Sequence, residues 1–289
     1  MDTFGARLHA AVRERGPLCV GIDPHATLLS AWGLPDTAYG LERFAMTTVE
    51  ALADQVAVLK PQSAFFERHG GAGVQVLERT IAAARSAGAL VLLDVKRGDI
   101  GSTAQAYADA YLGPTSPLAA DAVTVSPYLG FGSLLPFLDV AAEHGRGVFV
   151  LALTSNPEGA SVQQAVGPAG TVAGSVLAAL LELNAGATPL GSFGAVVGAT
   201  IGSTTEDLDI NGPLLAPGFG AQGATVEDLH AVFGASLPRV LPATSRELLR
   251  TGPDVASLRA EADRVATTLS GVTTRACSHP PLGHRAPLT

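Results

Sequence analysis

The chain has 289 residues, of which 47% are hydrophobic and 15% charged, and its formal net charge is −8. A chain of this length and composition can bury a large core, and both one-domain and two-domain arrangements are open to it. The acidic balance argues against a nucleic acid or an anionic membrane as partner, because no basic stripe is present, although a small anionic metabolite can still bind where local charge favours it.

Strands and helices are predicted to alternate along most of the chain. The first helix carries Phe4, Leu8 and Ala11 at helical spacing, and Gly16-Pro17 ends it. Short aliphatic and β-branched runs then predict strands, with helical segments between them. In chain order we expect helix 3–15, strand 18–24, a helix from about 38 to about 54, strand 56–60, helix 73–87, strand 90–96, helix 102–111, strand 122–127, helix 133–143, strand 147–153, a helix within 159–187, strand 194–200, strand 213–220, helix 226–233 and strand 239–244.

Eight strands in roughly 250 residues predict an α/β fold, a closed (β/α)8 TIM barrel, with a doubly wound open sheet as the alternative. Polar residues after the strands favour the barrel, because strand ends converge on one mouth in a barrel and spread along an edge in an open sheet. We expect a single barrel domain over residues 1–269, then a flexible tail over 270–289 without periodicity. The polar residues are Asp23, Lys60, Asp94, Lys96, Ser126, Thr154, Ser155 and the loop 217–222.

Segment 90–100 departs most from ordinary strand patterning. Residues 90–93 have the length and composition of a strand covered on both faces, and Asp94 and Lys96 follow directly. Residues two apart leave a strand on the same side, so this carboxylate and this ammonium are expected to lie together. A structural salt bridge is one reading, since unpaired charges are costly to bury.

Lysine usage favours chemistry over a structural salt bridge. Of the 18 lysines and arginines, only Lys60 and Lys96 are lysines, and each follows or ends an expected strand. Arginine keeps its proton in proteins, whereas a lysine ammonium can donate a proton or form a Schiff base. Two lysines kept for these positions therefore indicate a catalytic site.

The last two strands are followed by features of a phosphate site. Segment 216–223 is rich in glycine, which lets backbone N–H groups approach an anion closely. Arg246 follows the eighth strand at the start of an expected helix, and a helix amino terminus with a guanidinium suits a phosphate. Glycine turns and a surface arginine are the alternative. Asp23 could likewise cap a turn before Pro24, and residues 154–157 could be only a turn.

Histidine and cysteine give weaker indications. The seven histidines lack ligand spacing, so we predict no metal site. Cys19 fits a buried strand better than a nucleophile, and its distance in sequence from Cys277 argues against a disulfide framework. Residues 1–7 lack the features of a secretory signal, and no apolar stretch is long enough to span a bilayer. We therefore expect a cytoplasmic protein without a nucleic-acid or membrane partner.

The pattern Asp94-x-Lys96-x-x-Asp99-Ile100-x-x-Thr103 resembles the motif of the orotidine 5'-phosphate decarboxylase family. Agreement extends along nearly the whole barrel, from Gly21-Ile22-Asp23-Pro24 to Arg246, and the segments 60–67 and 126–130 are similar to the longer bacterial subgroup. The resemblance implies decarboxylation of orotidine 5'-phosphate to UMP and CO2 in de novo pyrimidine biosynthesis, by a carboxy-lyase that needs no cofactor.

The resemblance also implies roles for the matching residues. Lys96 would protonate C6 of the pyrimidine, Asp94 would face the substrate carboxylate, and Lys60 would hold the charges in place. Asp99, with Ile100 and Thr103, would reach into the active site of the partner subunit of a homodimer.

Substrate-binding roles are implied for the residues around this centre. Segment 154–158 departs from the commoner Ser-His-Pro-Gly form, and Ser245-Arg246 replaces the Gly-Arg of many members. The implied contacts are Asp23 with the ribose, Ser155 with the pyrimidine edge, and Gln222 with Arg246 on the phosphate, next to Pro217.

Three other functions remain open from the residues alone. A class I aldolase would use Lys60 or Lys96 as a neutral Schiff-base nucleophile. A sugar-phosphate decarboxylase similar to this family would pair the Asp-x-Lys motif with Mg²⁺. A catalytically inactive phosphate-binding module would keep the glycine loop and Arg246 but would not need both lysines.

Overall fold

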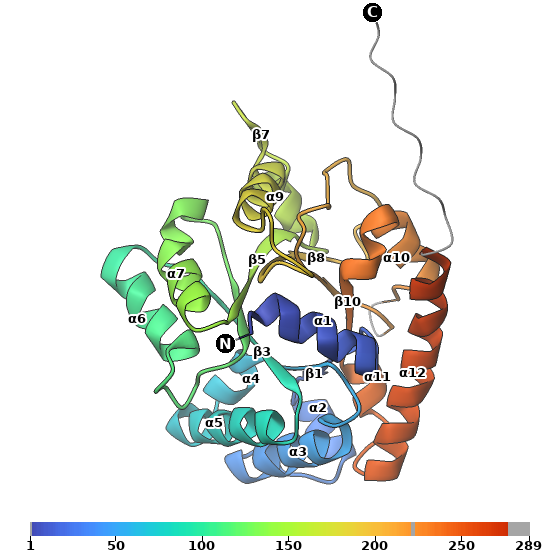
Figure 1. The fold of residues 1–289 in the computed structure, drawn as a ribbon. Coiled ribbons are helices and arrows are strands. Elements are labelled where there is room, and N and C mark those ends of the chain that lie inside the picture. Colours follow the sequence, from blue (N-terminus) through green and yellow to red (C-terminus); the bar gives the residue numbers. More distant parts are fainter. Residues whose placement is uncertain (1, 221–222, 277–289) are drawn as a thin grey trace, which may run out of the picture.

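The protein, described by a computed structural model, is a closed barrel of parallel strands surrounded by helices (Figure 1). The structure describes residues 2–220 and 223–276, with side chains up to residue 269. Strand order around the barrel is β1-β10-β9-β8-β5-β4-β3-β2, which confirms the predicted (β/α)8 barrel and excludes the open sheet. The barrel strands are β1 (Cys19–Ile22), β2 (Val58–Pro61), β3 (Leu90–Arg97), β4 (Ala122–Val125), β5 (Gly147–Leu153), β8 (Phe193–Val197), β9 (Leu214–Pro217) and β10 (Val240–Thr244).

Helices occupy most of the connections, and each predicted helix has a counterpart in the structure. Several short elements were not predicted, including α2 (Ala26–Ala31), α4 (Ser63–Glu67) and the two-stranded hairpin of β6 (Val166–Gly167) and β7 (Gly170–Thr171). The connection from β8 to β9, residues 198–213 and described throughout, contains no helix. The α-helices are α1 (Phe4–Arg15), α2 (Ala26–Ala31), α3 (Ala38–Leu52), α4 (Ser63–Glu67), α5 (Gly70–Ser86), α6 (Gly101–Leu112), α7 (Leu135–Glu143), α8 (Ala160–Gln163), α9 (Val172–Leu183), α10 (Val226–Phe233), α11 (Arg246–Leu249) and α12 (Val255–Ala276).

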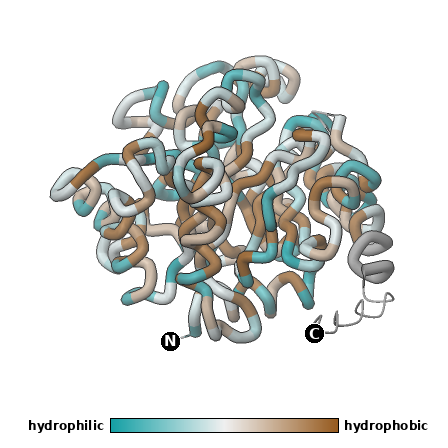
Figure 2. The backbone as a smooth tube through the Cα atoms, turned by 90° about the horizontal axis from the view of Figure 1, so that it is seen from above, coloured by the Kyte–Doolittle hydropathy of each residue, from teal (hydrophilic) through white to brown (hydrophobic). Residues whose placement is uncertain are grey.

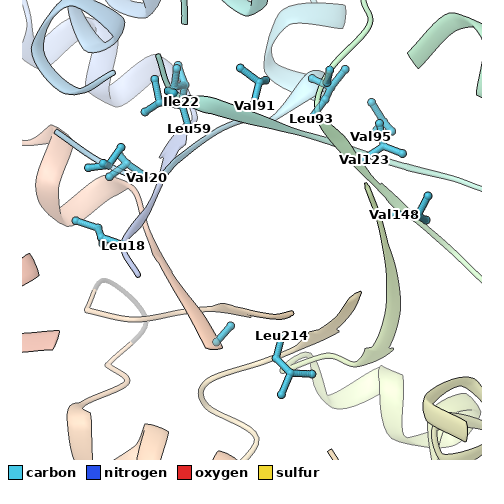
Figure 3. Close-up of a cluster of buried hydrophobic side chains, with 14 of the residues drawn as sticks. Leu18, Val20, Ile22, Leu59, Val91, Leu93, Val95, Val123, Val148 and Leu214 are labelled. Carbon is cyan, nitrogen blue, oxygen red and sulfur yellow. The ribbon is translucent and has the colours of Figure 1, made fainter. Parts of the chain in front are cut away.

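Alternation along the strands divides the core into two apolar layers. Outward-facing residues such as Leu59, Val91 and Leu93 pack beneath the helices (Figure 3). The next residues along the strands, such as Leu90 and Leu92, form a separate cluster inside the barrel. In Figure 2, hydrophobic stretches of the chain run through the middle of the molecule. The interior apolar cluster does not include the inward residues at the carboxyl ends of β2 and β3, where polar side chains stand instead.

Helix α1 covers the amino end of the barrel. Thr3 caps the helix by accepting a hydrogen bond from the Ala6 amide at 3.2 Å. Phe4 and Leu8 are buried in the interior cluster, and the Phe4 ring meets the edge of Phe149 at a centroid distance of 6.0 Å. A Cβ on Gly147 would come within 2.4 Å of the Phe4 ring, so this glycine allows the helix to seat. The amino end is thus filled by apolar side chains.

The carboxyl-terminal segment is more regular than the sequence suggested. Helix α12 continues to Ala276, so the boundary predicted after residue 269 falls inside it, and residues 277–289 lie outside the described part of the chain. Arg259 joins this helix to α3 through a 3.0 Å hydrogen bond from Nε to the Ala51 carbonyl. Leu258 and Val265 on the same helix are buried.

Candidate active site

An aspartate between two ammonium groups lies at the carboxyl end of the barrel. Asp94 Oδ2 is 3.0 Å from Lys60 Nζ, and Asp94 Oδ1 is 2.6 Å from Lys96 Nζ. The side chains of Lys60 and Asp94 are each 8% exposed, whereas that of Lys96 is 44% exposed. The array therefore has a buried half, which fixes the charges, and an open half, which a bound molecule can reach.

Further hydrogen bonds hold the Asp94 carboxylate. Thr124 donates its hydroxyl hydrogen to Asp94 Oδ1 at 2.7 Å. With its amide nitrogen turned toward Asp94, Gln62 donates to Oδ2 at 2.9 Å and to the Asp94 carbonyl at 2.7 Å, and it accepts from Lys96 at 3.3 Å. Both carboxylate oxygens thus have two partners, and the carboxylate is fixed in orientation.

The charges of the array stabilise one another. Burial alone would lower the pKa of Lys60, but the negative charges of Asp94 and Asp23 outweigh it and raise that pKa above its ordinary value. Burial alone would raise the pKa of Asp94, but Lys60 and Lys96 outweigh it and lower that pKa. Lys60 is therefore an ammonium and Asp94 a carboxylate at neutral pH.

Lys96 owes its direction to an irregularity in β3. Its φ of 47° lies in the left-handed region, which costs a residue with a Cβ about 1–2 kcal/mol. The register with β4 shifts between Leu93 and Arg97, which marks a bulge. The Lys96 amide donates to Thr124 Oγ1 at 3.0 Å, so the threonine that holds Asp94 also holds the bulge.

A pocket opens beside the array at the ends of β1, β9 and β10. Gly21 makes room for it, because a Cβ there would lie 2.9 Å from Ser245 Cβ and 3.0 Å from Asp23 Oδ2. Asp23 Oδ1 and Ser245 Oγ are buried and lack a hydrogen-bond partner among the described residues. Unsatisfied buried polar atoms are uncommon in proteins and point to a polar ligand. The pocket is lined by Gly21, Asp23, Lys60, Pro217, Gly218, Phe219, Ala243, Thr244, Ser245 and Arg246.

The remaining predicted site residues are distributed differently. Ser155 is exposed and lines a neighbouring polar hollow with Thr154 and Thr200. Ile100 and Thr103 are exposed at the start of α6, and Asp99 Oδ1 accepts a 2.9 Å hydrogen bond from the Ile100 amide. These residues do not line the pocket described above, and Gln222 lies outside the described residues.

Sequence reasoning missed Gln62, Thr124 and Ser245. Gln62 stands two residues after Lys60, and Thr124 stands inward on β4, so strand alternation would have identified both. From the sequence, Ser245 is identified only as the residue that replaces a glycine before Arg246. Its hydroxyl makes no capping bond to α11 and belongs to the pocket instead.

The model of the orotidine 5'-phosphate decarboxylase / HUMPS family matches residues 16–260, which include the whole array and pocket. This chain belongs to that family. The family assignment confirms the predicted resemblance, and decarboxylases are carboxy-lyases, the enzyme class that the motif predicted.

Curated relatives extend along nearly the whole chain. The orotidine 5'-phosphate decarboxylase of Salinispora arenicola is 69% identical over 267 residues, which are 92% of this chain and 96% of the relative. That of Streptomyces coelicolor is 64% identical over 271 residues, or 93% of this chain and 98% of the relative. A crystal structure from Streptomyces avermitilis, provisionally named as the same enzyme, has a TM-score of 0.93 and 62% identity, covering 95% of this chain and 97% of its own.

The residues that the structure describes contain no group of three or more His, Cys, Asp or Glu side chains arranged to hold a metal ion. Within the same residues, no helix is both long and apolar enough to cross a bilayer.

Proposed function

We propose that this protein decarboxylates orotidine 5'-monophosphate to UMP and CO2, with Lys96 as the proton donor to C6 and with no cofactor. The Asp94 carboxylate between Lys60 and Lys96 carries the proposal. Loss of CO2 leaves a carbanion at a ring carbon without a conventional electron sink. A fixed ammonium beside that carbon favours the anion electrostatically and then supplies the proton.

Each member of the array contributes a different effect. The substrate carboxylate would lie near Asp94, and repulsion between the two carboxylates is relieved as CO2 departs. Lys60 keeps Asp94 ionised and in place from the buried side, while Lys96 faces the open side. A preorganised array of this kind needs little rearrangement during the reaction.

The pocket beside the array suits the ribose and phosphate. Asp23 Oδ1 and Ser245 Oγ offer unsatisfied polar atoms for sugar hydroxyls. Gly218 has a φ of 107°, a conformation suited to glycine, and it leaves the backbone accessible next to the exposed guanidinium of Arg246. Binding energy from a phosphate here can position the distant pyrimidine on the array. Ser155 would contact the edge of the pyrimidine, and Gln222 would bind the phosphate together with Arg246.

The array disfavours two of the alternatives. A Schiff-base aldolase needs a neutral amine, whereas the raised pKa of Lys60 keeps that amine protonated. Lys96 Nζ lies 2.6 Å from the Asp94 carboxylate, a contact that favours the ammonium form over the neutral amine. A Mg²⁺-dependent decarboxylase needs free carboxylate lone pairs. Both oxygens of Asp94 already accept hydrogen bonds, and ammonium groups on either side would repel the metal.

A direct assay tests the proposal. Purified protein treated with EDTA should convert orotidine 5'-monophosphate to UMP, followed by the change in pyrimidine absorbance and by release of CO2. Retained activity after EDTA supports the cofactor-free mechanism, whereas activity restored only by Mg²⁺ supports the metal-dependent alternative. No turnover with or without Mg²⁺ contradicts the proposed reaction.

A homodimer with shared sites extends the proposal. Asp99, Ile100 and Thr103 lie outside the pocket of their own chain, and Ile100 is 62% exposed. Tyr128 and Leu129, on the loop after β4, are also exposed. Exposed apolar side chains on neighbouring loops favour contact with a second copy. A cytoplasmic location fits a biosynthetic enzyme whose Cys19 is a free, buried thiol.

Subunit exchange tests the dimer. Mixing inactive Asp94→Asn and Asp99→Asn chains should restore part of the activity, since one hybrid site would combine an intact Asp94 with an intact Asp99. Mixing either variant with itself is the control. Subunit exchange is verified with mass-tagged chains. If exchange occurs and no activity is recovered, the sites are not shared.

A further inference from the structure

Arg97 directly follows the lysine of the array, and its guanidinium lies on the outer side of the barrel. It donates to Glu67 Oε1 at 2.5 Å and to the Tyr111 hydroxyl at 3.3 Å. Its guanidinium carbon is 5.6 Å from the centre of the Tyr107 ring and 5.8 Å from that of the Tyr111 ring. Two hydrogen bonds and two aromatic contacts fix a side chain that is otherwise among the most flexible.

The same guanidinium also holds the backbone around Lys96. Arg97 Nη1 donates to the Val95 carbonyl at 3.3 Å, so the side chain reaches back across the left-handed residue. The Arg97 carbonyl accepts from the Ser126 amide at 2.8 Å, and the Lys96 amide donates to Thr124. The bulge that directs Lys96 is therefore held on each side.

Glu67 links Arg97 to the other lysine-bearing strand. Glu67 ends α4, and the Ser63 hydroxyl donates to it from the start of the same helix. The residue before Ser63 is Gln62, which contacts both Asp94 and Lys96. The Arg97–Glu67 pair thus connects the β3 bulge with the segment that carries Gln62.

We infer that Arg97 is a positioning residue, which keeps the Lys96 ammonium on Asp94 by fixing the β3 bulge against α4 and α6. The inference rests on the proposed function only for its effect on turnover. The left-handed conformation of Lys96 is unfavourable on its own and persists only where surrounding contacts enforce it. Without the guanidinium, relaxation of the bulge would change the direction of the Lys96 Cα–Cβ bond and move the ammonium away from Asp94.

The presence of only two lysines allows a test that does not depend on activity. Protein grown with lysine labelled with carbon-13 at Cε should give one NMR signal for Lys60 and one for Lys96, assigned with Lys96→Ala. In Arg97→Met we expect the Lys96 signal to shift or broaden while the Lys60 signal stays in place. Arg97→Lys, which keeps the charge but not the planar fork, should show an intermediate change.

Steady-state kinetics supply the second measurement. Arg97→Met should lower kcat roughly 10- to 100-fold, the effect expected when a reacting group is misplaced by about 1 Å. KM and the affinity for UMP should be unchanged, because the phosphate pocket is untouched. Tyr111→Phe and Glu67→Gln, which remove single contacts and preserve packing, should give smaller effects in the same direction.

A surface pair provides the matched control. Arg79 on α5 donates to Glu42 on α3 at 2.8 Å between the outer helices, and its side chain is 48% exposed, so Arg79→Met should leave kcat and both lysine signals unchanged. An unmoved Lys96 signal in Arg97→Met would overturn the inference. So would a shift of both lysine signals with a lower melting temperature, which would indicate general destabilisation. An inactive wild-type protein would instead contradict the proposed function, and the NMR comparison would still test Arg97.

Discussion

Each end of the barrel buries an aspartate among cations, yet the two sites differ in what else the charged groups contact. At the amino end, Asp121 is 2% exposed, and Arg7 donates to its Oδ1 at 2.7 Å. Arg85 and Arg146 approach the same carboxylate to 3.5 Å. At the carboxyl end, Asp94 has lysines as its cations.

The arginines at the amino end are committed to the backbone as well. Arg7 donates to the Gly145 carbonyl at 3.0 Å, and Arg146 donates to the Ala120 carbonyl at 2.8 Å. Asp121 Oδ2 accepts a hydrogen bond from the Val91 amide at 3.0 Å, so the carboxylate satisfies a backbone donor near the start of β3. These bonds join loops beneath the barrel and have a structural role.

The comparison shows that a buried carboxylate with cations does not by itself identify an active site. Lysine in place of arginine allows proton transfer, Lys96 is half-exposed, and Lys60 lines a pocket with unsatisfied polar atoms. At the amino end the interior is filled by α1 instead. Charge pairing stabilises both ends of the barrel. The carboxyl end differs because a ligand can reach its charged groups and because a lysine there can donate a proton.

The largest expected effect comes from removing the proposed proton donor. Lys96→Ala should lower kcat by about 10⁴-fold, since both proton donation and charge stabilisation are lost. Arg146→Met at the other end should leave kcat unchanged. Single-turnover assays of both variants, with circular dichroism to confirm folding, would measure the contrast. Substantial turnover by Lys96→Ala would remove the distinction between the two ends.

A change at the amino end should affect stability instead. Asp121→Asn leaves the neighbouring guanidinium groups without their anion, and we expect the free energy of unfolding to fall by about 3 kcal/mol. The kcat of the folded protein should be retained. Urea denaturation and active-site titration separate the two quantities. A variant that is as stable as wild type but inactive would place a catalytic role at the wrong end of the barrel.

Arg246 sharpens the contrast between binding and structural arginines. It is exposed in the pocket, so Arg246→Ala should raise KM by about 30-fold, which corresponds to about 2 kcal/mol for a hydrogen bond to a charged phosphate. The change in kcat should be much smaller. Dephosphorylated substrate should bind the variant and the wild type equally, and a persisting difference would argue against phosphate recognition by this residue.

The smallest effect concerns pH. The pKa of Asp94 is lowered in the folded protein by its two lysine partners. Its ionisation therefore stabilises the fold at pH values above the ordinary aspartate pKa of about 3.9, and this contribution is lost as the pH falls toward the folded-state pKa. The stability difference between wild type and Asp94→Asn should therefore be constant from pH 5 to about pH 8 and narrow below about pH 4. Urea unfolding at a series of pH values measures it, and a difference that already narrows near pH 6 would contradict the strong pairing.

The residues that the sequence identified best were those at the carboxyl ends of strands. Strand boundaries were enough to place Lys60, Asp94 and Lys96 at one rim, and the structure brings them into contact, with Lys96 directed by a bulge and not by regular alternation. The left-handed conformation of Lys96 could not be predicted, because neither a glycine nor an asparagine marks the position. It arises from tertiary contacts that sequence spacing does not encode.

The apolar pattern of α12 is present in the sequence. Leu258, Ala262, Val265 and Leu269 recur at helical spacing and would have predicted α12. The pairing of Arg97 with Glu67 has no such signal, since 30 residues separate them and either charge could have faced solvent. Long-range pairs of this kind can be identified only from the folded structure.

The apolar side chains of α1 close the amino end of the barrel interior, so the carboxyl end is the side from which a ligand reaches the array. Under the proposed function, nucleotide would enter and UMP and carbon dioxide would leave at that same rim, and carbon dioxide would have to pass the bound UMP or wait for its release. Attachment of the protein to a solid support through its first residues should therefore leave the site open to solvent.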